Sequence, residues 1–445
     1  MKKVNIITLG CSKNTVDSEF LAGSLQQIGY KTYFDHIKND CEIVVINTCG
    51  FIGDAKEESI NVILDQCEKK RRGRKKRILV VAGCLVERYK EELRTEMPEV
   101  DLWYGVHEWD SIASDIFQLD TTYTPSAVSI PLTQRIVSTP KHYAFLKISE
   151  GCDRHCSYCA IPLIRGRHKS RSIESLIDEA KILVNHGAKE LIVIAQDTTY
   201  YGIDLYGERR LGELLKRLAE ESGAEWIRLH YTYPTSFPED AIEVIRTHDN
   251  ICNYIDIPLQ HISSNLLKSM QRGIDKEGTL SLLQKFRTAL PQVSIRTTLI
   301  VGYPGEGARE FEELKEFVRE ARFDRLGVFA YSPEEGTPAE QLGDPVPNEE
   351  KERRIDELMA LQESISLDIN ETMTGKTYKV LIDRKEGDYW VGRTEYDSPE
   401  IDNEVLIFDN GTSDIKIGQF CRVHITEAME HDLMGVIENV DSLIR

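Results

Sequence analysis

Hydrophobic runs of strand length alternate with stretches of helical periodicity along most of the chain. In the first 120 residues VNIITL, EIVVIN and RILVVA each lead to a cysteine and then to a helical pattern. The helices are expected to begin near Thr15, Asp54 and Val86. Alternating β and α elements predict a parallel sheet, whose strand-end loops open on one edge where ligands characteristically bind. We therefore expect Cys11, Cys49 and Cys84 to converge.

A second series of strand-like runs lies between Tyr143 and Tyr331. It comprises AFLKIS, ELIVIA, EWIRLH, NYIDIP, VSIRTTLIV and RLGVFAY, with room for a helix after each run. Six such units predict a partial, open (βα)6 version of the eight-unit barrel. Barrels of this kind place their chemistry at the C-terminal ends of the strands. A cysteine-rich segment follows the first run directly, so it lies where a cofactor site is expected.

The remaining segments divide the chain. Ser, Thr and Pro dominate residues 121–140, which indicates a linker or irregular crossing segment. A charged helical stretch from Pro347 to about Thr372 precedes short alternating runs that predict a small β-barrel of about 70 residues. We expect an α/β multidomain fold: an N-terminal open parallel α/β sheet (1–120), a linker (121–140), a central partial barrel (141–371) and a small all-β barrel (372–445).

Composition limits the environment in which the chain works. Of its 445 residues 41% are hydrophobic and 29% charged, and no apolar run approaches the roughly 18 residues of a membrane span. The N-terminal text has no secretory cleavage pattern, so we expect a cytoplasmic protein with no membrane association. The formal net charge of -19 disfavours general nucleic-acid binding. In a reducing compartment, clustered cysteines more often bind metal than form disulfides.

The strongest chemical motif is EGCDRHCSYCAIP, in which Cys152, Cys156 and Cys159 have C-x3-C-x2-C spacing. Cubane iron–sulfur clusters normally take four cysteines, so three leave one iron free to bind a ligand, as a catalytic cluster requires. The alternative is a zinc site or plain structural thiols. Zinc would need a fourth ligand, and His155 lies in a cramped position between two of the cysteines.

CDRHCSYC resembles the cysteine triplet of the radical S-adenosylmethionine superfamily. The resemblance implies that the open iron binds S-adenosylmethionine and that an electron cleaves it to a 5′-deoxyadenosyl radical. Further matches are LIVIAQD and the GYPGE turn after TTLIV, although GxPGE alone is usually an ordinary turn. The cofactor contacts that the resemblance implies are Tyr158, Gln196, Asp197, Arg296, Gly302 and Glu306.

The whole chain resembles the methylthiotransferases, which combine a three-cysteine domain, a radical barrel and a C-terminal TRAM barrel of OB-like form. The matching segments are GCSKNTVDSE, INTCGF and AGCLVERY, and each contains one cysteine. The resemblance implies a second [4Fe-4S] cluster on Cys11, Cys49 and Cys84, whose open iron handles the inserted sulfur. One S-adenosylmethionine would donate a methyl group and another would be cleaved. The alternative is that the three cysteines are buried structural thiols. The reaction that the resemblance implies requires no catalytic carboxylate pair.

Two branches of this family differ in substrate. CSKN, CGFIGDAKEES, AQDTTYYG and YSPEEGTPA resemble the enzymes that methylthiolate the β-carbon of an aspartate in ribosomal protein S12, and the alternative is a transfer-RNA adenosine C2 methylthiotransferase. Residues 372–445 hold eight Lys or Arg and fifteen Asp or Glu, a charge of 8 − 15 = -7. An RNA-gripping barrel should be basic, so this charge favours a basic protein substrate. The chemistry also implies an electron donor such as flavodoxin or ferredoxin.

Several features stay open between two interpretations. The basic run Lys69 to Arg77 is either a solvated loop or a contact with RNA or a ribosomal surface. Asp256 and Gln260, after a barrel strand, either hold substrate or cofactor or serve packing. The four cysteines without partners at ligand spacing are expected to be small buried hydrophobes: Cys41, Cys67, Cys252 and Cys421.

Overall fold

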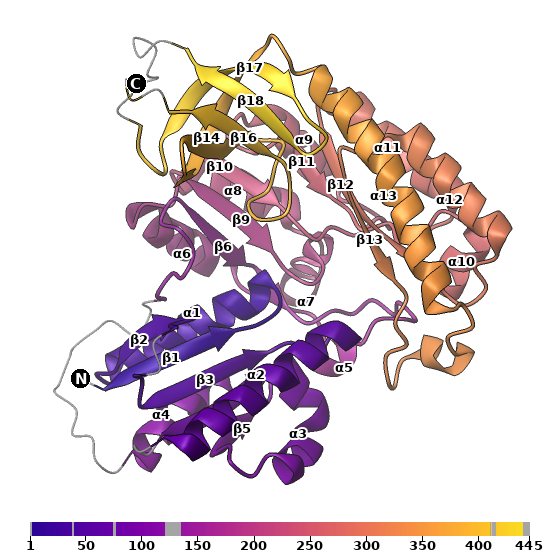
Figure 1. The fold of residues 1–445 in the computed structure, drawn as a ribbon. Coiled ribbons are helices and arrows are strands. Elements are labelled where there is room, and N and C mark those ends of the chain that lie inside the picture. Colours follow the sequence, from indigo (N-terminus) through magenta and orange to yellow (C-terminus); the bar gives the residue numbers. More distant parts are fainter. Residues whose placement is uncertain are drawn as a thin grey trace.

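The computed structural model describes residues 2–37, 40–73, 77–120, 135–409, 411 and 415–438. Figure 1 shows three bodies in chain order: an N-terminal sheet with its helices, a central open barrel, and a small β-barrel at the far end of the molecule from the N-terminal sheet. Within the described ranges no helix is both long and apolar enough to cross a membrane. The expected α/β multidomain fold is confirmed.

The N-terminal body is a five-stranded parallel sheet in the order β2-β1-β3-β4-β5. Helices α1 and α4 cover one face and α2 and α3 the other, so the strands β3 and β4 are buried along their whole length. The elements are β1 (Lys3–Thr8), α1 (Ser12–Gln27), β2 (Lys31–Phe34), β3 (Ile43–Thr48), α2 (Gly53–Arg72), β4 (Ile78–Gly83), α3 (Cys84–Glu96), β5 (Leu102–Tyr104) and α4 (Trp109–Leu119).

The three predicted strand–cysteine–helix units are present, and the helices begin one to three residues earlier than expected. The difference of two residues at α3 places Cys84 inside the first turn of that helix rather than before it. The strands β2 and β5 were not predicted. Both are short, and they form the two edges of the sheet, where hydrophobic patterning is weakest.

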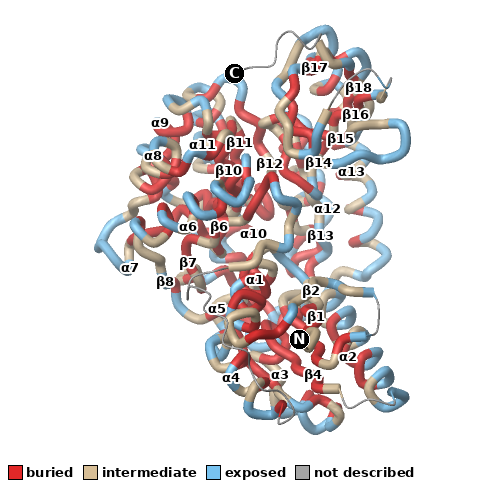
Figure 2. The backbone as a smooth tube through the Cα atoms, turned by 90° about the vertical axis from the view of Figure 1, so that its left-hand side faces the viewer, coloured by how far each residue is buried: buried red, intermediate tan, exposed pale blue. Residues whose placement is uncertain are grey.

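The central body contains the six predicted strands, all parallel to their neighbours, as β6-β9-β10 and β11-β12-β13. A single bridge between Ile227 and Ile251 joins the two halves into an open barrel. Figure 2 shows buried residues along these strands and exposed residues on the outer helices. The main elements are β6 (Tyr143–Lys147), α6 (Ile173–Asn185), β9 (Glu190–Ile194), α8 (Leu211–Glu221), β10 (Trp226–Leu229), α9 (Glu239–Thr247), β11 (Tyr254–Asp256), α11 (Lys276–Ala289), β12 (Ser294–Val301), α12 (Ala308–Ala321) and β13 (Arg325–Ala330).

Short elements occupy the loops of this barrel. They are β7 (Ser149–Glu150), α5 (Ile161–Arg165), β8 (Lys169–Ser170), η1 (Thr198–Tyr200), α7 (Ile203–Tyr206), α10 (Ser264–Ser269) and η2 (Pro338–Leu342). The long helix α13 (Asn348–Glu371) then crosses the outside of β13 and leads to the last body. It confirms the helix expected between Pro347 and Thr372.

The C-terminal body is a closed barrel in the order β14-β15-β16-β18-β17, as the alternating pattern predicted. Its strands are β14 (Thr377–Glu386), β15 (Tyr389–Arg393), β16 (Glu404–Phe408), β17 (Phe420–Ala428) and β18 (Asp432–Ile437). The last strand, DLMGVI, was not predicted. It closes the barrel by pairing with both β16 and β17.

The loop between β15 and β16 packs into the N-terminal end of the central barrel. Arg325, the first residue of β13, donates to Asp397 across 2.9 Å. Tyr254, the first residue of β11, donates to Asp402 across 2.8 Å. The C-terminal body therefore covers the end of the barrel opposite the one where chemistry is expected.

The N-terminal body docks at the C-terminal ends of the barrel strands (Figure 1). Glu334, in the loop after β13, is 2% exposed and accepts from Lys56 of α2 and Arg88 of α3 across 2.8 and 2.9 Å. On the other side the Lys13 ammonium lies 2.9 Å from the ring centroid of Tyr231, which follows β10. The cysteine-bearing edge of the sheet thus faces the mouth of the barrel.

The predictions for the linker and for the basic run can be compared with the structure only in part, because some of these residues lie outside the described ranges. The linker expected at 121–140 falls outside the described residues up to 134, and from Arg135 onward it packs between α1 and α6, with Arg135 donating to Glu19 and Glu179. Of the basic run, residues 74–76 are not described. Its first part ends α2, where Lys69 and Lys70 pair with Asp65 and Asp101, as on a solvated helical surface.

Candidate functional site

Cys11, Cys49 and Cys84 follow the three adjacent strands β1, β3 and β4. Cys11 is the N-cap residue of α1, and Cys84 opens α3. Close packing holds the loops together: a Cβ on Gly10 would lie 2.8 Å from the Cβ of Cys49, so only glycine fits there. The predicted convergence at one sheet edge is therefore present in the structure.

Electrostatics around this first trio differ from one thiol to the next. Burial raises the pKa of Cys84 to about 11 and also raises that of Cys49. Burial alone would raise the pKa of Cys11, but the charges of Lys13 and Arg165, together with backbone hydrogen bonds from Lys13 and Asn14, lower that pKa. The Arg165 guanidinium donates to the Cys84 sulfur across 3.4 Å. A buried thiol that resists ionisation in water becomes a thiolate when a metal binds it.

Cys152, Cys156 and Cys159 lie in the loop between β7 and α5, at the C-terminal end of the first barrel strand. The Cys159 amide donates to the Cys156 carbonyl across 3.1 Å, which folds the loop into a tight turn. The Cys156 sulfur lies 3.4 Å from the Tyr233 hydroxyl. Burial raises the pKa of Cys152 to about 12 and raises that of Cys159 as well. Cys152 and Cys156 are buried and Cys159 is half-buried, and the three cysteines of this second trio are also gathered in one place.

The two trios are joined by the short helix α5. It begins two residues after Cys159 and ends at Arg165, whose guanidinium reaches Cys84. Ala160 and Ile164 pack against Cys84 in one buried cluster. The six residues from Ala160 to Arg165 thus connect the two cysteine sites, and they pack against both.

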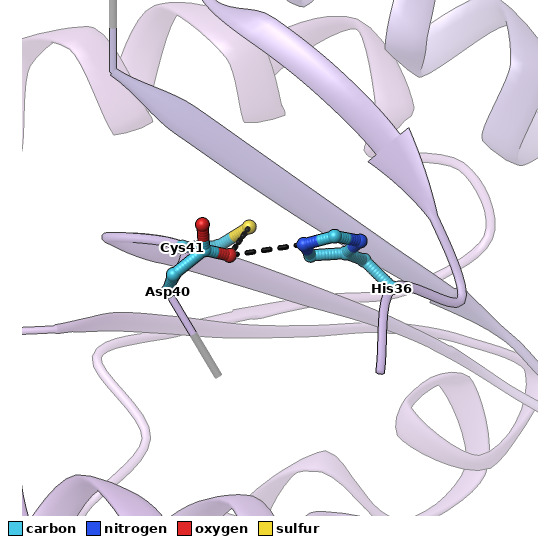
Figure 3. A group of neighbouring side chains, drawn as sticks. All are labelled: His36, Asp40 and Cys41. Atoms are coloured by element: carbon cyan, nitrogen blue, oxygen red, sulfur yellow. Dashed lines mark hydrogen bonds and ion pairs between the residues drawn. The ribbon is translucent and has the colours of Figure 1, made fainter. Parts of the chain in front are cut away.

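A compact group of three possible metal ligands occurs elsewhere, at His36, Asp40 and Cys41 (Figure 3). Their ligand atoms lie within 4.8 Å of one another, closer than those of either cysteine trio in the described part of the chain. Cys41 is buried, as expected, but its two polar neighbours were not predicted. The exposed Asp40 carboxylate already accepts from His36 across 2.9 Å and pairs with Lys3. The group is a satisfied surface network.

The wider spacing of the two trios bears on the zinc alternative. Around a single tetrahedral zinc ion, thiolate sulfurs lie about 3.8 Å apart, because each Zn–S bond is about 2.3 Å long. A four-iron cluster is larger and holds its thiolates farther apart. As they stand in the structure, the sulfurs of both trios are therefore too widely spaced to close around one zinc ion.

Three of the residues expected to contact the cofactor are held by protein neighbours. The Tyr158 hydroxyl accepts from Arg272 across 3.3 Å. The amide of Gln196 donates to Glu150 across 2.8 Å, and its buried oxygen has no partner. Asp197 accepts from Arg154 across 2.7 Å. All lie at the C-terminal ends of the barrel strands, and their cofactor roles stay predictions.

The GYPGE segment closes on itself. The Glu306 carboxylate accepts from the backbone amides of Gly302 and Tyr303 and lies 3.1 Å from Arg354. Arg296 lies near the N-terminal end of β12. Its guanidinium lies 3.3 Å from Asp256 of β11 and 3.2 Å from Asp402 of the loop between β15 and β16. The structure thus gives both segments an internal role, which does not test the predicted cofactor contacts.

Glu306 makes stability depend on pH. Burial raises its pKa to about 7, although Arg354 lowers it. The folded chain therefore holds a proton that the unfolded chain releases above about pH 4.3, so stability falls as pH rises from about 4.3 to about 7. Glu306→Gln should remove this loss, about 3 kcal/mol across the window. We expect the unfolding midpoints of wild type and variant to diverge with pH, the variant gaining towards pH 7.

The matched control is Glu320→Gln, on the exposed side of the adjacent helix α12. Its unfolding midpoint should follow that of wild type at every pH. Parallel pH profiles for wild type and Glu306→Gln would show that the buried carboxyl does not titrate in this window.

Sequence reasoning missed the polar residues between the two trios. Arg165 contacts Asp17 across 2.8 Å and Asn14 across 2.5 Å on α1, besides Cys84. Glu150 contacts the same guanidinium and the Lys147 ammonium. The only signal was position: Arg165 lies six residues after Cys159, on the helix that begins at the triplet. Arg272 lies in the loop after α10 and was not assigned a role.

Comparison with known protein families agrees with this architecture. Residues 3–105 match the family described as Uncharacterized protein family UPF0004, residues 146–318 the Radical SAM superfamily, and residues 374–437 the TRAM domain. A solved structure of the radical S-adenosylmethionine methyltransferase TsrM from Kitasatospora setae has a TM-score of 0.55 at 13% identity, covering 84% of this chain and 79% of that one. Its similarity supports the fold alone. The chain is a radical S-adenosylmethionine enzyme.

Two relatives match over nearly their whole length. Proteins of Phocaeicola vulgatus and Bacteroides thetaiotaomicron, both named ribosomal protein uS12 methylthiotransferase RimO, are 54% and 53% identical to this chain. Each match covers 98% of this chain and 99% of the relative. The chain belongs to the RimO family of radical S-adenosylmethionine methylthiotransferases.

Proposed function

We propose that this chain adds a methylthio group to the β-carbon of an aspartate in ribosomal protein S12. The proposal rests on one observation above all: two cysteine trios lie at facing edges of the N-terminal sheet and the barrel, joined by α5. One [4Fe-4S] cluster would be held by Cys152, Cys156 and Cys159. The other would be held by Cys11, Cys49 and Cys84.

The residues present fit two such clusters. Three thiolates leave one iron of each cluster open, and the described surroundings of both trios supply a cationic side chain against a sulfur, Arg165 at Cys84 and Arg272 at Cys156. When bound, one cluster supplies the electron that cleaves S-adenosylmethionine and the other a site for the sulfur to be transferred.

The chain's own residues position the reactants and exclude water. Glu334 with Lys56 and Arg88 holds the N-terminal sheet over the barrel mouth, so the space between the two trios is covered on that side. The loop at Asp397 and Asp402 fills the other end of the barrel. Closure at both ends supports radical chemistry, because a reactive carbon-centred species must be kept from solvent.

The terminal barrel supports a protein substrate rather than RNA. Residues 372–445 carry a formal charge of -7, with eight basic and fifteen acidic side chains. Such a surface attracts a basic protein and repels a phosphate backbone. In this proposal residues 1–120 hold the sulfur-handling cluster, residues 141–371 hold the radical site, and residues 372–445 form a barrel whose negative charge attracts the substrate protein. A small electron carrier such as flavodoxin or ferredoxin supplies electrons in the cytoplasm.

The test compares cells with and without this protein. Intact-mass and peptide analysis should show ribosomal protein S12 lighter by about 46 Da in the deletion strain, with the difference on one aspartate. Transfer-RNA nucleosides from the same cells should be unchanged. Loss of a methylthio group from an adenosine, with S12 unaltered, would assign the chain to the transfer-RNA reaction instead.

A further inference from the structure

Arg272 is a buried cation at the mouth of the barrel. It follows α10 and is 4% exposed. Its guanidinium donates to the Cys156 sulfur across 3.4 Å, to the Tyr158 hydroxyl across 3.3 Å and to the Pro258 carbonyl. Its Nε is buried and has no hydrogen-bond partner. All of these partners are formally neutral when the thiol is protonated.

No carboxylate of the described chain lies within ion-pair distance of Arg272. In this respect Arg272 differs from the other two arginines near the cysteines. Arg165 pairs with Asp17 and Glu150, and Arg154 pairs with Asp197. Burying a charge without a counter-ion is strongly unfavourable, so an unpaired guanidinium destabilises the fold unless an anion binds beside it. Thiolates that ligate a metal cluster supply such an anion, and Cys156 is the group that Arg272 already touches.

Tyr233 fixes the guanidinium in place. Its ring lies between two cations, 4.0 Å from the Arg154 guanidinium carbon and 4.2 Å from that of Arg272. The Tyr233 hydroxyl lies 3.4 Å from the Cys156 sulfur and donates to the Arg272 carbonyl across 3.0 Å. Tyr233 therefore contacts both the guanidinium and the backbone of Arg272, and it holds them next to Cys156.

We propose that Arg272 is a positioning residue that sets the reduction potential of the cluster held by Cys152, Cys156 and Cys159. It does so by placing an uncompensated positive charge and an N–H donor on the Cys156 sulfur. The reduced cluster carries one more electron than the oxidised cluster, so a cation beside a ligating sulfur stabilises the reduced form and raises the potential. This inference rests on the proposed two-cluster function.

The experiment is an anaerobic redox titration of the reconstituted full-length protein, with a one-electron reductant and detection by electron paramagnetic resonance. Arg272→Met keeps the length of the side chain and removes its charge. At a fixed potential we expect the ratio of reduced to oxidised cluster to fall about tenfold at this site, a negative shift of about 59 mV for a one-electron couple. Arg272→Lys keeps the charge and should recover most of that ratio.

Arg165→Met is the matched control, because Arg165 is equally buried but touches the other trio and is paired with carboxylates. It should alter the cluster at Cys84 and leave the potential of the Cys156 cluster nearly unchanged. Iron and sulfide are counted in every sample. Wild-type protein that takes up no iron contradicts the proposed function itself, whereas normal iron with an unshifted potential in Arg272→Met overturns only the role of Arg272.

A neutral variant that takes up too little iron at this site to titrate is also decisive. If Arg272→Met lacks this cluster and Arg272→Lys binds it normally, the site requires the charge itself, which is the strongest form of the inference. If Arg272→Lys lacks the cluster as Arg272→Met does, shape rather than charge is needed, and the inference is wrong.

Discussion

Replacing Cys152, Cys156 and Cys159 together by alanine is expected to abolish the reductive cleavage of S-adenosylmethionine. The cluster that this trio would hold is the proposed source of the electron that cleaves the sulfonium, so formation of 5′-deoxyadenosine should fall to background. The measurement is chromatographic detection of 5′-deoxyadenosine after anaerobic incubation with a reductant. The remaining trio should still bind its iron.

The control for this variant is Cys67→Ala, a buried cysteine of α2 outside both trios. It should form 5′-deoxyadenosine at the wild-type rate, apart from a modest loss of stability on truncation of a buried side chain. A triple variant that retains measurable cleavage would remove the radical site from this loop.

Replacing Cys11, Cys49 and Cys84 together by alanine should separate the two halves of the reaction. The barrel trio is untouched, so the variant should still form 5′-deoxyadenosine, within about tenfold of the wild-type rate. Methylthiolation of the substrate should be lost completely, because no other trio in the described chain can hold the sulfur near the barrel mouth. Mass spectrometry of the substrate protein and chromatography of the nucleoside, from one incubation, give both results.

Two outcomes would contradict this separation. Methylthiolated product from the variant would show that the sulfur is handled elsewhere. Loss of 5′-deoxyadenosine together with the product would show that the N-terminal trio supports the radical site directly. The second outcome would be consistent with the packing of α5, including Arg165, against Cys84. It would not be consistent with two independent sites.

The parts of the fold that the sequence predicted are those with strong local patterns. The strands β3 and β4 are buried on both faces, so they appear as uninterrupted hydrophobic runs, and the six barrel strands are equally clear. The strands β2, β5 and β18 have no such signature: two are short sheet edges, and DLMGVI is only half-buried. Edge positions bury too little surface to constrain their sequence.

The site divides in the same way. The six cysteines could be found because their spacing, or their position after a hydrophobic run, is local in the chain. The arginines could not, because Arg165 meets Cys84 across 81 residues and Arg272 meets Cys156 across 116. Arg296 was predicted as a cofactor contact, yet Asp402 of the terminal barrel lies against it, 106 residues away. Contacts of this kind follow from tertiary packing, which periodicity does not encode.

The most direct test of the central claim is the iron and sulfide content of anaerobically reconstituted protein, measured for wild type and for each triple-alanine variant. Two separate clusters of four irons predict about eight irons and eight sulfides per chain in wild type and about four of each in either variant. A wild type with four irons, or a variant that loses all of its iron, would show that the six cysteines serve a single centre.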